Sequence, residues 1–79
     1  LNSWLLELRD FTEPTTHPGE EFVFCLRGRA TLNVGGATYQ LESGDAASFW
    51  SAEPHNYGPA EPLAEDDPSV LLLSVWVHE

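Results

Sequence analysis

Residues 17–28, HPGEEFVFCLRG, place a histidine and two glutamates directly before an apolar run that stops at a glycine. The run, residues 22–27, has apolar side chains on both of its faces, which is typical of a strand that is covered on both sides. Because side chains alternate along a strand, an inward Glu21 brings Val23 and Cys25 inward with it. The segment therefore predicts a core strand that is entered from a polar loop.

The rest of the chain has the pattern of short strands separated by turns. Residues 4–11 alternate between apolar and polar side chains, residues 30–41 form two runs joined by the glycine pair 35–36, and residues 46–50 and 69–77 are further apolar runs. Paired glycines supply the positive φ angles of a two-residue hairpin turn. No segment predicts a helix. The pattern is therefore that of an all-β sandwich or barrel.

Residues 52–68 lack a strand pattern and carry four prolines together with the acidic cluster 65–67. Proline cannot donate to a sheet ladder, so a run this rich in proline argues against a strand. A structureless stretch of this length is uncommon in a small domain and usually has a function or is mobile. We expect a long loop before the last strand, with His55 near its beginning.

Length and charge limit the classes of function. A chain of 79 residues forms one domain. A domain of this size buries only about 60% of its unfolded surface, so we expect a partner subunit to help cover it. The 13 Asp and Glu against 3 Lys and Arg give a formal net charge of −10. Because nucleic-acid affinity depends mainly on Lys and Arg neutralising phosphates, this segment is predicted to bind neither nucleic acid nor an anionic membrane directly.

Cys25 is the only cysteine, which excludes an internal disulfide. Its apolar neighbours predict a buried thiol, and the expected location is the reducing cytoplasm. The longest apolar run, residues 70–73, is too short to cross a bilayer, and the chain shows no signal-peptide pattern. Because the chain starts at Leu1 and contains no methionine, we expect residues 1–79 to be one domain of a longer protein.

The histidines supply candidate metal ligands. His17 and Glu21 lie four residues apart where the loop enters the core strand, and His55 follows a later turn. If the two loops meet, two imidazoles and one carboxylate converge, a donor set used for Fe(II) and tolerated by Mn, Zn and Ni. With water, the same side chains would instead form a hydrogen-bonded polar floor. His78 is expected to be exposed and uninvolved.

Four stretches, taken in order, resemble the cupin superfamily: HPGEEFVFCLRG, VGG, YQLESGDAASFW and PHNY. They are especially similar to the small cupin domains that follow a helix-turn-helix domain in bacterial regulators of the XRE type. Glu21 and Gly28 keep the glutamate-to-glycine spacing of the first cupin motif, and Gly44 and His55 match the ends of the second. The resemblance implies a cupin double-stranded β-helix, a small jelly-roll-like barrel, over residues 1–79.

The resemblance also implies a metal centre with an incomplete ligand set. His17, Glu21 and His55 fall on three of the four family ligand positions, and Thr15 stands where the first motif has its other histidine. The cofactor implied is a divalent transition metal (Zn, Fe, Mn or Ni). Strand alternation and the family pattern together predict the residues of a ligand pocket: Val23, Cys25, Phe49 and Tyr57.

Two functions from different classes follow from the resemblance. The first is the sensor domain of a bacterial transcriptional regulator, in which a small-molecule effector enters the barrel and a separate N-terminal domain binds DNA. The second is a small metal-dependent enzyme of the dioxygenase or isomerase type, with its site at His17, Glu21 and His55. A third interpretation is a domain that serves only to dimerise. We favour the sensor, because no obvious proton-transfer group accompanies the metal ligands.

A homodimer is predicted from the outer face of the core strand. The apolar side chains on that face need cover on so small a barrel. They are Phe22, Phe24 and Leu26. The three tryptophans, Trp4, Trp50 and Trp76, are expected in the core or at an interface rather than as ligand platforms.

Overall fold

The structure, a computed structural model, describes residues 2–77, so His78 lies outside the described residues. Within residues 2–77 it contains no helix, and so none that could cross a membrane. The strands are, in chain order, β1 (Asn2–Leu8), β2 (Glu20–Arg27), β3 (Arg29–Val34), β4 (Ala37–Glu42), β5 (Ala46–Trp50), β6 (His55–Pro59) and β7 (Val70–Val77). The predicted all-β class is confirmed.

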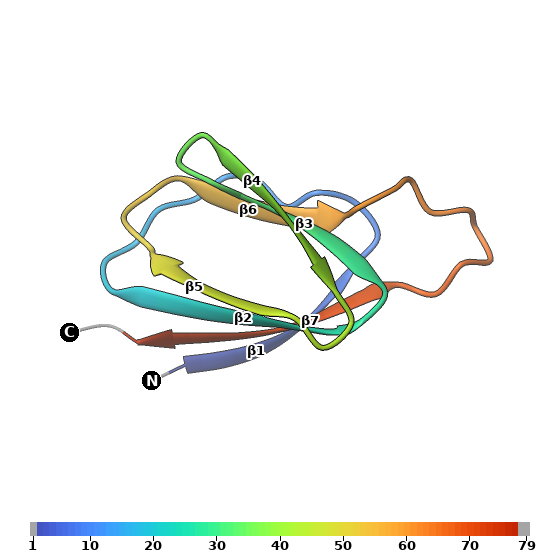
Figure 1. Ribbon diagram of the computed structural model, residues 1–79, viewed down its shortest axis with the longest axis horizontal. Helices are drawn as coiled ribbons and strands as arrows, with labels where there is room; N and C mark the ends of the chain where they lie inside the picture. Colours follow the sequence, from blue (N-terminus) through green and yellow to red (C-terminus); the bar gives the residue numbers. More distant parts are fainter. Residues whose placement is uncertain (1, 78–79) are drawn as a thin grey trace.

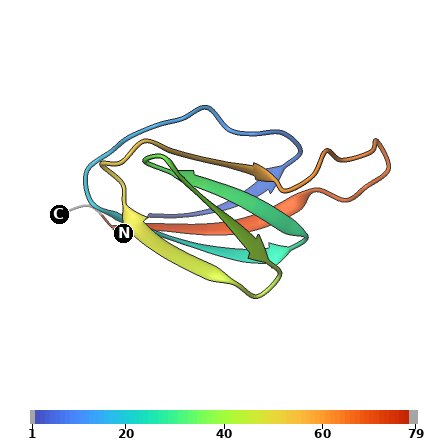
Figure 2. The same ribbon diagram turned by 45° about the horizontal axis from the view of Figure 1, so that its top comes forward.

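The strands form two antiparallel sheets (Figure 1). The larger sheet has the order β1-β7-β2-β5, and the smaller sheet has the order β4-β3-β6. Figure 2 shows the smaller sheet facing the larger one. In both views the loop between β6 and β7 projects from one end of the molecule, and the segment that enters β2 lies at the other end.

Strand β2 contributes buried residues of the larger sheet to the core. Alternation places Glu21, Val23 and Cys25 on its inner face, and all three are buried as predicted. Leu72 pairs with Cys25 from β7, and Leu32 joins the same cluster from the smaller sheet. Burying one leucine completely contributes roughly 2 kcal/mol, so a few such side chains account for much of the stability of so small a domain.

The prediction of an uninterrupted loop over residues 52–68 is wrong, because β6 lies inside it. β6 pairs with β3 along its whole length, and on its other side Tyr57 O accepts a hydrogen bond from Thr12 N at 2.9 Å. Gly58 makes this close approach possible, since a Cβ there would lie 2.6 Å from the ring of Phe11. Pairing on both sides thus outweighs the weak local strand signal, and it places His55 in a strand rather than in a loop.

Two glycine positions carry the predicted turns. The pair Gly35-Gly36 connects β3 to β4 with φ angles of 62° and 147°, which confirms the hairpin. Gly28 is the only residue between β2 and β3, where the chain passes from the larger to the smaller sheet. Its φ is 85°, and a Cβ there would lie 3.1 Å from Cγ2 of Val70. The glycine of the HPGEEFVFCLRG segment is therefore required by both conformation and space.

Gly28→Ala is expected to lower the free energy of unfolding more than Gly44→Ala. Both glycines have positive φ, which costs a side chain roughly 1–2 kcal/mol. Only Gly28 is also crowded, since nothing lies within 4 Å of a Cβ at Gly44. Urea denaturation of the two variants should show losses of about 1 kcal/mol for Gly44→Ala and about 2–3 kcal/mol for Gly28→Ala. Equal losses would mean that the contact with Val70 does not constrain the turn.

Candidate metal centre

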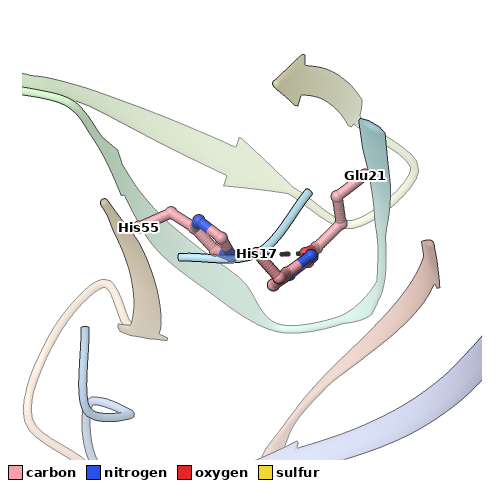
Figure 3. Close-up of side chains that lie close together, drawn as sticks. All are labelled: His17, Glu21 and His55. Carbon is pink, nitrogen blue, oxygen red and sulfur yellow. Dashed lines mark hydrogen bonds and ion pairs between the residues drawn. The ribbon is translucent and has the colours of Figure 1, made fainter. Parts of the chain in front are cut away.

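Three elements bring the predicted ligands together at the end of the molecule where the chain enters β2. Glu21 is an inner residue of β2, and His55 is the first residue of β6. His17 precedes β2, and its backbone N–H donates to Ser51 O at 3.0 Å. Figure 3 shows the two imidazoles and the carboxylate turned toward one another. Residues separated by up to 38 positions in the sequence, 17 to 55, therefore converge on one point.

The distances within the cluster are short. Glu21 Oε1 lies 3.2 Å from Nε2 of His17 and 3.3 Å from Nε2 of His55. The three possible ligand atoms all lie within 4.8 Å of one another. Glu21 and His55 are 2% and 1% exposed, whereas His17 is partly open to solvent. Solvent therefore reaches the cluster from the side of His17.

The other oxygen of Glu21 is held by two hydroxyl groups. Glu21 Oε2 accepts a hydrogen bond from the Tyr57 hydroxyl at 2.8 Å and one from the Ser74 hydroxyl at 3.0 Å. These hydroxyls supply hydrogen-bond donors to a carboxylate that is only 2% exposed. Burial, followed by the negative charge of Glu21, raises the pKa of Tyr57, so its phenol keeps the proton that it donates.

Sequence reasoning did not identify Ser74. The signal was present, because Ser74 is the one polar residue among the inward positions Val70, Leu72 and Ser74 of β7. A serine in such an alternating apolar series indicates that something polar lies opposite on the neighbouring strand. The sequence contains two glutamates at the start of β2, and register decides which of them is that partner.

His55 presents an unpaired nitrogen to Glu21. Its Nδ1 lies 2.8 Å from Glu53 O, and because a carbonyl only accepts, Nδ1 carries the proton. Nε2 is then the ring nitrogen that faces Glu21. This atom is buried and has no hydrogen-bond partner within residues 2–77, although Glu21 Oε1 is 3.3 Å away. The two atoms are therefore in close contact without a hydrogen bond.

A divalent cation would engage Nε2 of His55 and Oε1 of Glu21 at the same time. Metal–ligand bonds of about 2.1 Å separate neighbouring ligand atoms by about 3.0–3.4 Å. Glu21 Oε1 already lies 3.2 and 3.3 Å from the two imidazole nitrogens. The Nδ1 bond to Glu53 O also fixes the His55 ring with Nε2 turned inward, as is usual for histidine ligands. His17, Glu21 and His55 therefore fit a transition metal in donor type, and both nitrogen-to-oxygen distances fit its ligand spacing.

A cavity of about 280 Å³ opens beside the cluster. It is lined by Asn2, Trp4, Thr15, His17, Glu21, Tyr57, Ser74 and Trp76. Trp76 packs against His17 with ring centroids 4.2 Å apart, and its Nε1 donates to Pro18 O at 2.9 Å. Two tryptophans expected in the core or at an interface thus form walls of this cavity. The third, Trp50, is not among the lining residues and is 67% exposed.

The predicted pocket residues fall in three different places. Tyr57 lines the cavity. Phe49 packs beside His55 at 5.0 Å between ring centroids but lines a separate hollow near Leu32. Val23 and Cys25 are completely buried in the core and do not line the cavity, and burial raises the pKa of the Cys25 thiol. Alternation correctly placed Glu21, Val23 and Cys25 on the inner face of β2, but of these three only Glu21 lines the cavity.

Thr15 lies at the cavity wall, where the resemblance implied the missing histidine. Its backbone pairs with that of His55 through two hydrogen bonds of 3.0 Å. The structure thus brings position 15 beside a predicted ligand, as the family arrangement requires. A threonine hydroxyl is a weaker ligand than imidazole for a first-row transition metal, so the three candidate ligands would leave coordination positions open on a bound ion.

Comparison with known proteins gives one family and several related structures. The model of a family described as cupin domain (Cupin_2) matches residues 5–74. No curated protein matches significantly. A conserved protein of unknown function from Streptococcus pyogenes is 21% identical with a TM-score of 0.78, over 98% of this chain and 61% of that one. A cupin superfamily protein from Desulfitobacterium hafniense is 10% identical with a TM-score of 0.76, over 98% and 64%. This chain therefore spans less than two thirds of either protein.

Two further structures differ in the roles that their names describe. The Cupin_2 domain of an XRE family transcriptional regulator from Enterobacter cloacae is 22% identical with a TM-score of 0.74, over 98% of this chain and 77% of that one. Hydroxypropylphosphonic acid epoxidase from S. wedmorenis is 20% identical with a TM-score of 0.74, over 95% and 42%. At these identities the likeness establishes the fold, and the resemblance to XRE-type cupin domains is confirmed at that level.

Tyr57→Phe is expected to lower the free energy of unfolding by about 2 kcal/mol at neutral pH, because it removes one donor to a buried carboxylate. The folded-state pKa of Tyr57 is raised above the unfolded value of about 10. Its contribution is therefore complete below about pH 10 and is lost as the pH rises further. Urea denaturation in the presence of a chelator, at neutral pH and above about pH 10, measures both effects.

Tyr39→Phe is the matched control, because Tyr39 is 52% exposed and is the only other tyrosine. The alkaline loss of stability should be smaller in Tyr57→Phe than in the wild type and in Tyr39→Phe. A Tyr57→Phe protein that loses as much stability in alkali as the wild type would contradict the role of the phenol.

Proposed function

The chain belongs to the cupin domain family, and from this we propose that it binds a small molecule at a divalent transition metal held by His17, Glu21 and His55. The observation that carries the proposal is Nε2 of His55, a buried ring nitrogen that faces Glu21 Oε1 at 3.3 Å and has no hydrogen-bond partner among residues 2–77. Leaving such an atom unsatisfied costs about 1–3 kcal/mol. A bound cation removes that cost and accounts for the arrangement.

The donor set limits the metal to a few candidates. Two imidazoles and one carboxylate suit Zn, Fe, Mn or Ni, and thiolate is absent because Cys25 lies in the core. When bound, such an ion acts as a Lewis acid that polarises an oxygen of a ligand. The cavity of about 280 Å³ reaches the cluster at His17 and Glu21, so a small molecule could approach a bound ion from that side.

We propose that the bound molecule is an effector and that the domain is the sensor of a bacterial transcriptional regulator that acts in the cytoplasm. Outside the ligand set, the cavity offers few groups that transfer protons. Asn2 and Thr15 do not titrate in the physiological range, and Tyr57 keeps its proton because burial raises its pKa. The XRE regulator domain from Enterobacter cloacae, which this chain covers over 77% of its length, supports the assignment.

A metal-dependent enzyme is the second candidate, and one observation favours it. Two structures of a protein named HppE, one with Fe(II) and one with Co(II), each contain a bound substrate. They are 20% and 22% identical to this chain, with TM-scores of 0.74 and 0.76. Two histidines and one carboxylate with open positions is also the arrangement of non-haem Fe(II) oxygenases. This chain covers only 44% and 43% of those two chains, so more than half of each lies outside the matched region.

We also propose that the domain forms a homodimer through the outer face of the larger sheet. Phe22 and Leu5 are 39% and 61% exposed on that face, and Phe24 pairs there with Leu73. A contiguous apolar face is unusual on a monomer. A second copy covers it with the same surface, as a twofold-symmetric interface requires. A dimer gives the sensor a means of response, because a ligand that changes one sheet also changes the spacing of the two protomers.

Glu21→Gln is expected to abolish stoichiometric metal binding, whereas Glu20→Gln retains it. The two glutamates are adjacent, but Glu21 faces the histidines and Glu20 points to solvent. Equilibrium dialysis against Zn²⁺ or Ni²⁺, followed by elemental analysis, should give about one ion per chain for the wild type and for Glu20→Gln, and at least tenfold weaker binding for Glu21→Gln. Far-ultraviolet circular dichroism establishes that each variant is folded. Wild-type protein that binds no metal, or equal binding by both variants, would refute the metal site.

Phe22→Asp is expected to convert a dimer into a monomer, because it places a charge in the apolar face. Tyr39→Asp, at a more exposed aromatic of the other sheet, is expected to leave the dimer intact. Light scattering coupled to size-exclusion chromatography measures the mass of each protein at micromolar concentration. A monomeric wild type under those conditions would contradict the proposed interface.

A further inference from the structure

We infer that the cavity selects small molecules that carry a single negatively charged oxygen group on an apolar body, such as aromatic monocarboxylates, and rejects dianions such as phosphonates. The inference rests on the proposed metal site and specifies the class of ligand that binds there. Three features of the cavity carry it: the charges of its lining, the use of its hydroxyl groups, and the position of its tryptophans.

The lining of the cavity contains no lysine or arginine among the described residues. Its one carboxylate belongs to Glu21. Apart from the candidate ligands and the two hydroxyls bonded to Glu21, its polar members are Asn2 and Thr15. The chain has no lysine and only three arginines. Each arginine is engaged elsewhere: Arg9 donates to Asp67 O, Arg27 to Ser69 O and Arg29 to Glu61, each at 2.7 Å. An anionic ligand therefore finds no guanidinium or ammonium partner.

The hydroxyl groups nearest the cluster are already used. Tyr57 and Ser74 both donate their single hydroxyl hydrogen to Glu21 Oε2. Neither can also donate to a ligand without releasing the buried carboxylate. The charge of a bound anion must therefore be balanced at the metal itself.

The charge balance at the metal favours a monoanion. A divalent cation bound by Glu21 and two neutral imidazoles leaves one net positive charge, which one carboxylate neutralises. A dianion would leave one uncompensated negative charge in a partly buried site, within a chain whose formal net charge is already −10. Phosphonates and phosphates are normally held by Arg, Lys or backbone donors, and the lining lacks the first two.

The tryptophans supply a surface for the apolar body. Trp4 pairs with Ser74, so it lies on the inner face of the larger sheet, yet it is 60% exposed because β1 is the edge strand. Trp76 forms the neighbouring wall and packs against His17. A flat apolar group beside Trp4 would cover an exposed ring that faces the cavity rather than the outer surface.

The test uses Co²⁺-loaded wild-type protein, after calorimetry has established whether Co²⁺ binds. Benzoate and phenylphosphonate, the latter in its dianionic form at mildly alkaline pH, are titrated while the visible bands of Co²⁺ and tryptophan fluorescence are recorded. The two probes share a phenyl ring and differ in charge. Benzoate is expected to shift the Co²⁺ bands and to bind at least about tenfold more tightly than phenylphosphonate.

Trp4→Ala is expected to weaken benzoate binding about three- to tenfold with unchanged Co²⁺ affinity. Trp50→Ala is the matched control, because Trp50 is similarly exposed but lies away from the cavity. Phenylphosphonate that binds as tightly as benzoate, no binding of either probe to the Co²⁺-loaded protein, or equal effects of the two tryptophan variants would each overturn the inference and leave the metal site standing. Failure to bind Co²⁺ at all would overturn both the metal site and the inference.

Discussion

The buried carboxylate of Glu21 is the constraint on which the site depends. An ionised group that is 2% exposed needs a partner for each oxygen atom. Oε2 has the hydroxyls of Tyr57 and Ser74, which come from the smaller and the larger sheet. Oε1 is hydrogen-bonded to Nε2 of His17 at 3.2 Å, and it also faces Nε2 of His55, which has no hydrogen-bond partner among residues 2–77. The proposed cation would engage all three atoms together.

The same carboxylate ties the fold to the function. Its hydrogen bonds join β2, β6 and β7, so formation of the site requires that the two sheets have already closed. The conformation of Gly28 directs the chain from one sheet to the other directly after β2. The segment that supplies Glu21 therefore also builds the scaffold that brings His55 to it. Residues 17–28 thus contain both the turn glycine Gly28 and two of the candidate ligands, His17 and Glu21.

Much of this arrangement could be predicted from the sequence, because it follows from local rules. Alternation in β2 predicted the buried face of Glu21, and the glycine pair predicted the hairpin. The three ligands came from residue type and from the resemblance to cupins. What the sequence did not reveal depends on tertiary pairing. β6 exists because β3 and the segment at Thr12 pair with it, although prolines flank it.

The cavity walls escaped prediction for the same reason. Trp4 and Trp76 face the site only through the register of β1 and β7, which no local pattern specifies. The central claim, a metal bound by His17, Glu21 and His55, is tested most directly by anomalous diffraction from crystals of the protein grown with Zn²⁺ and measured at the zinc edge. The account predicts one strong peak between Glu21 Oε1 and the two Nε2 atoms. An ordered water at that point, hydrogen-bonded to all three side chains and without anomalous signal, would contradict it.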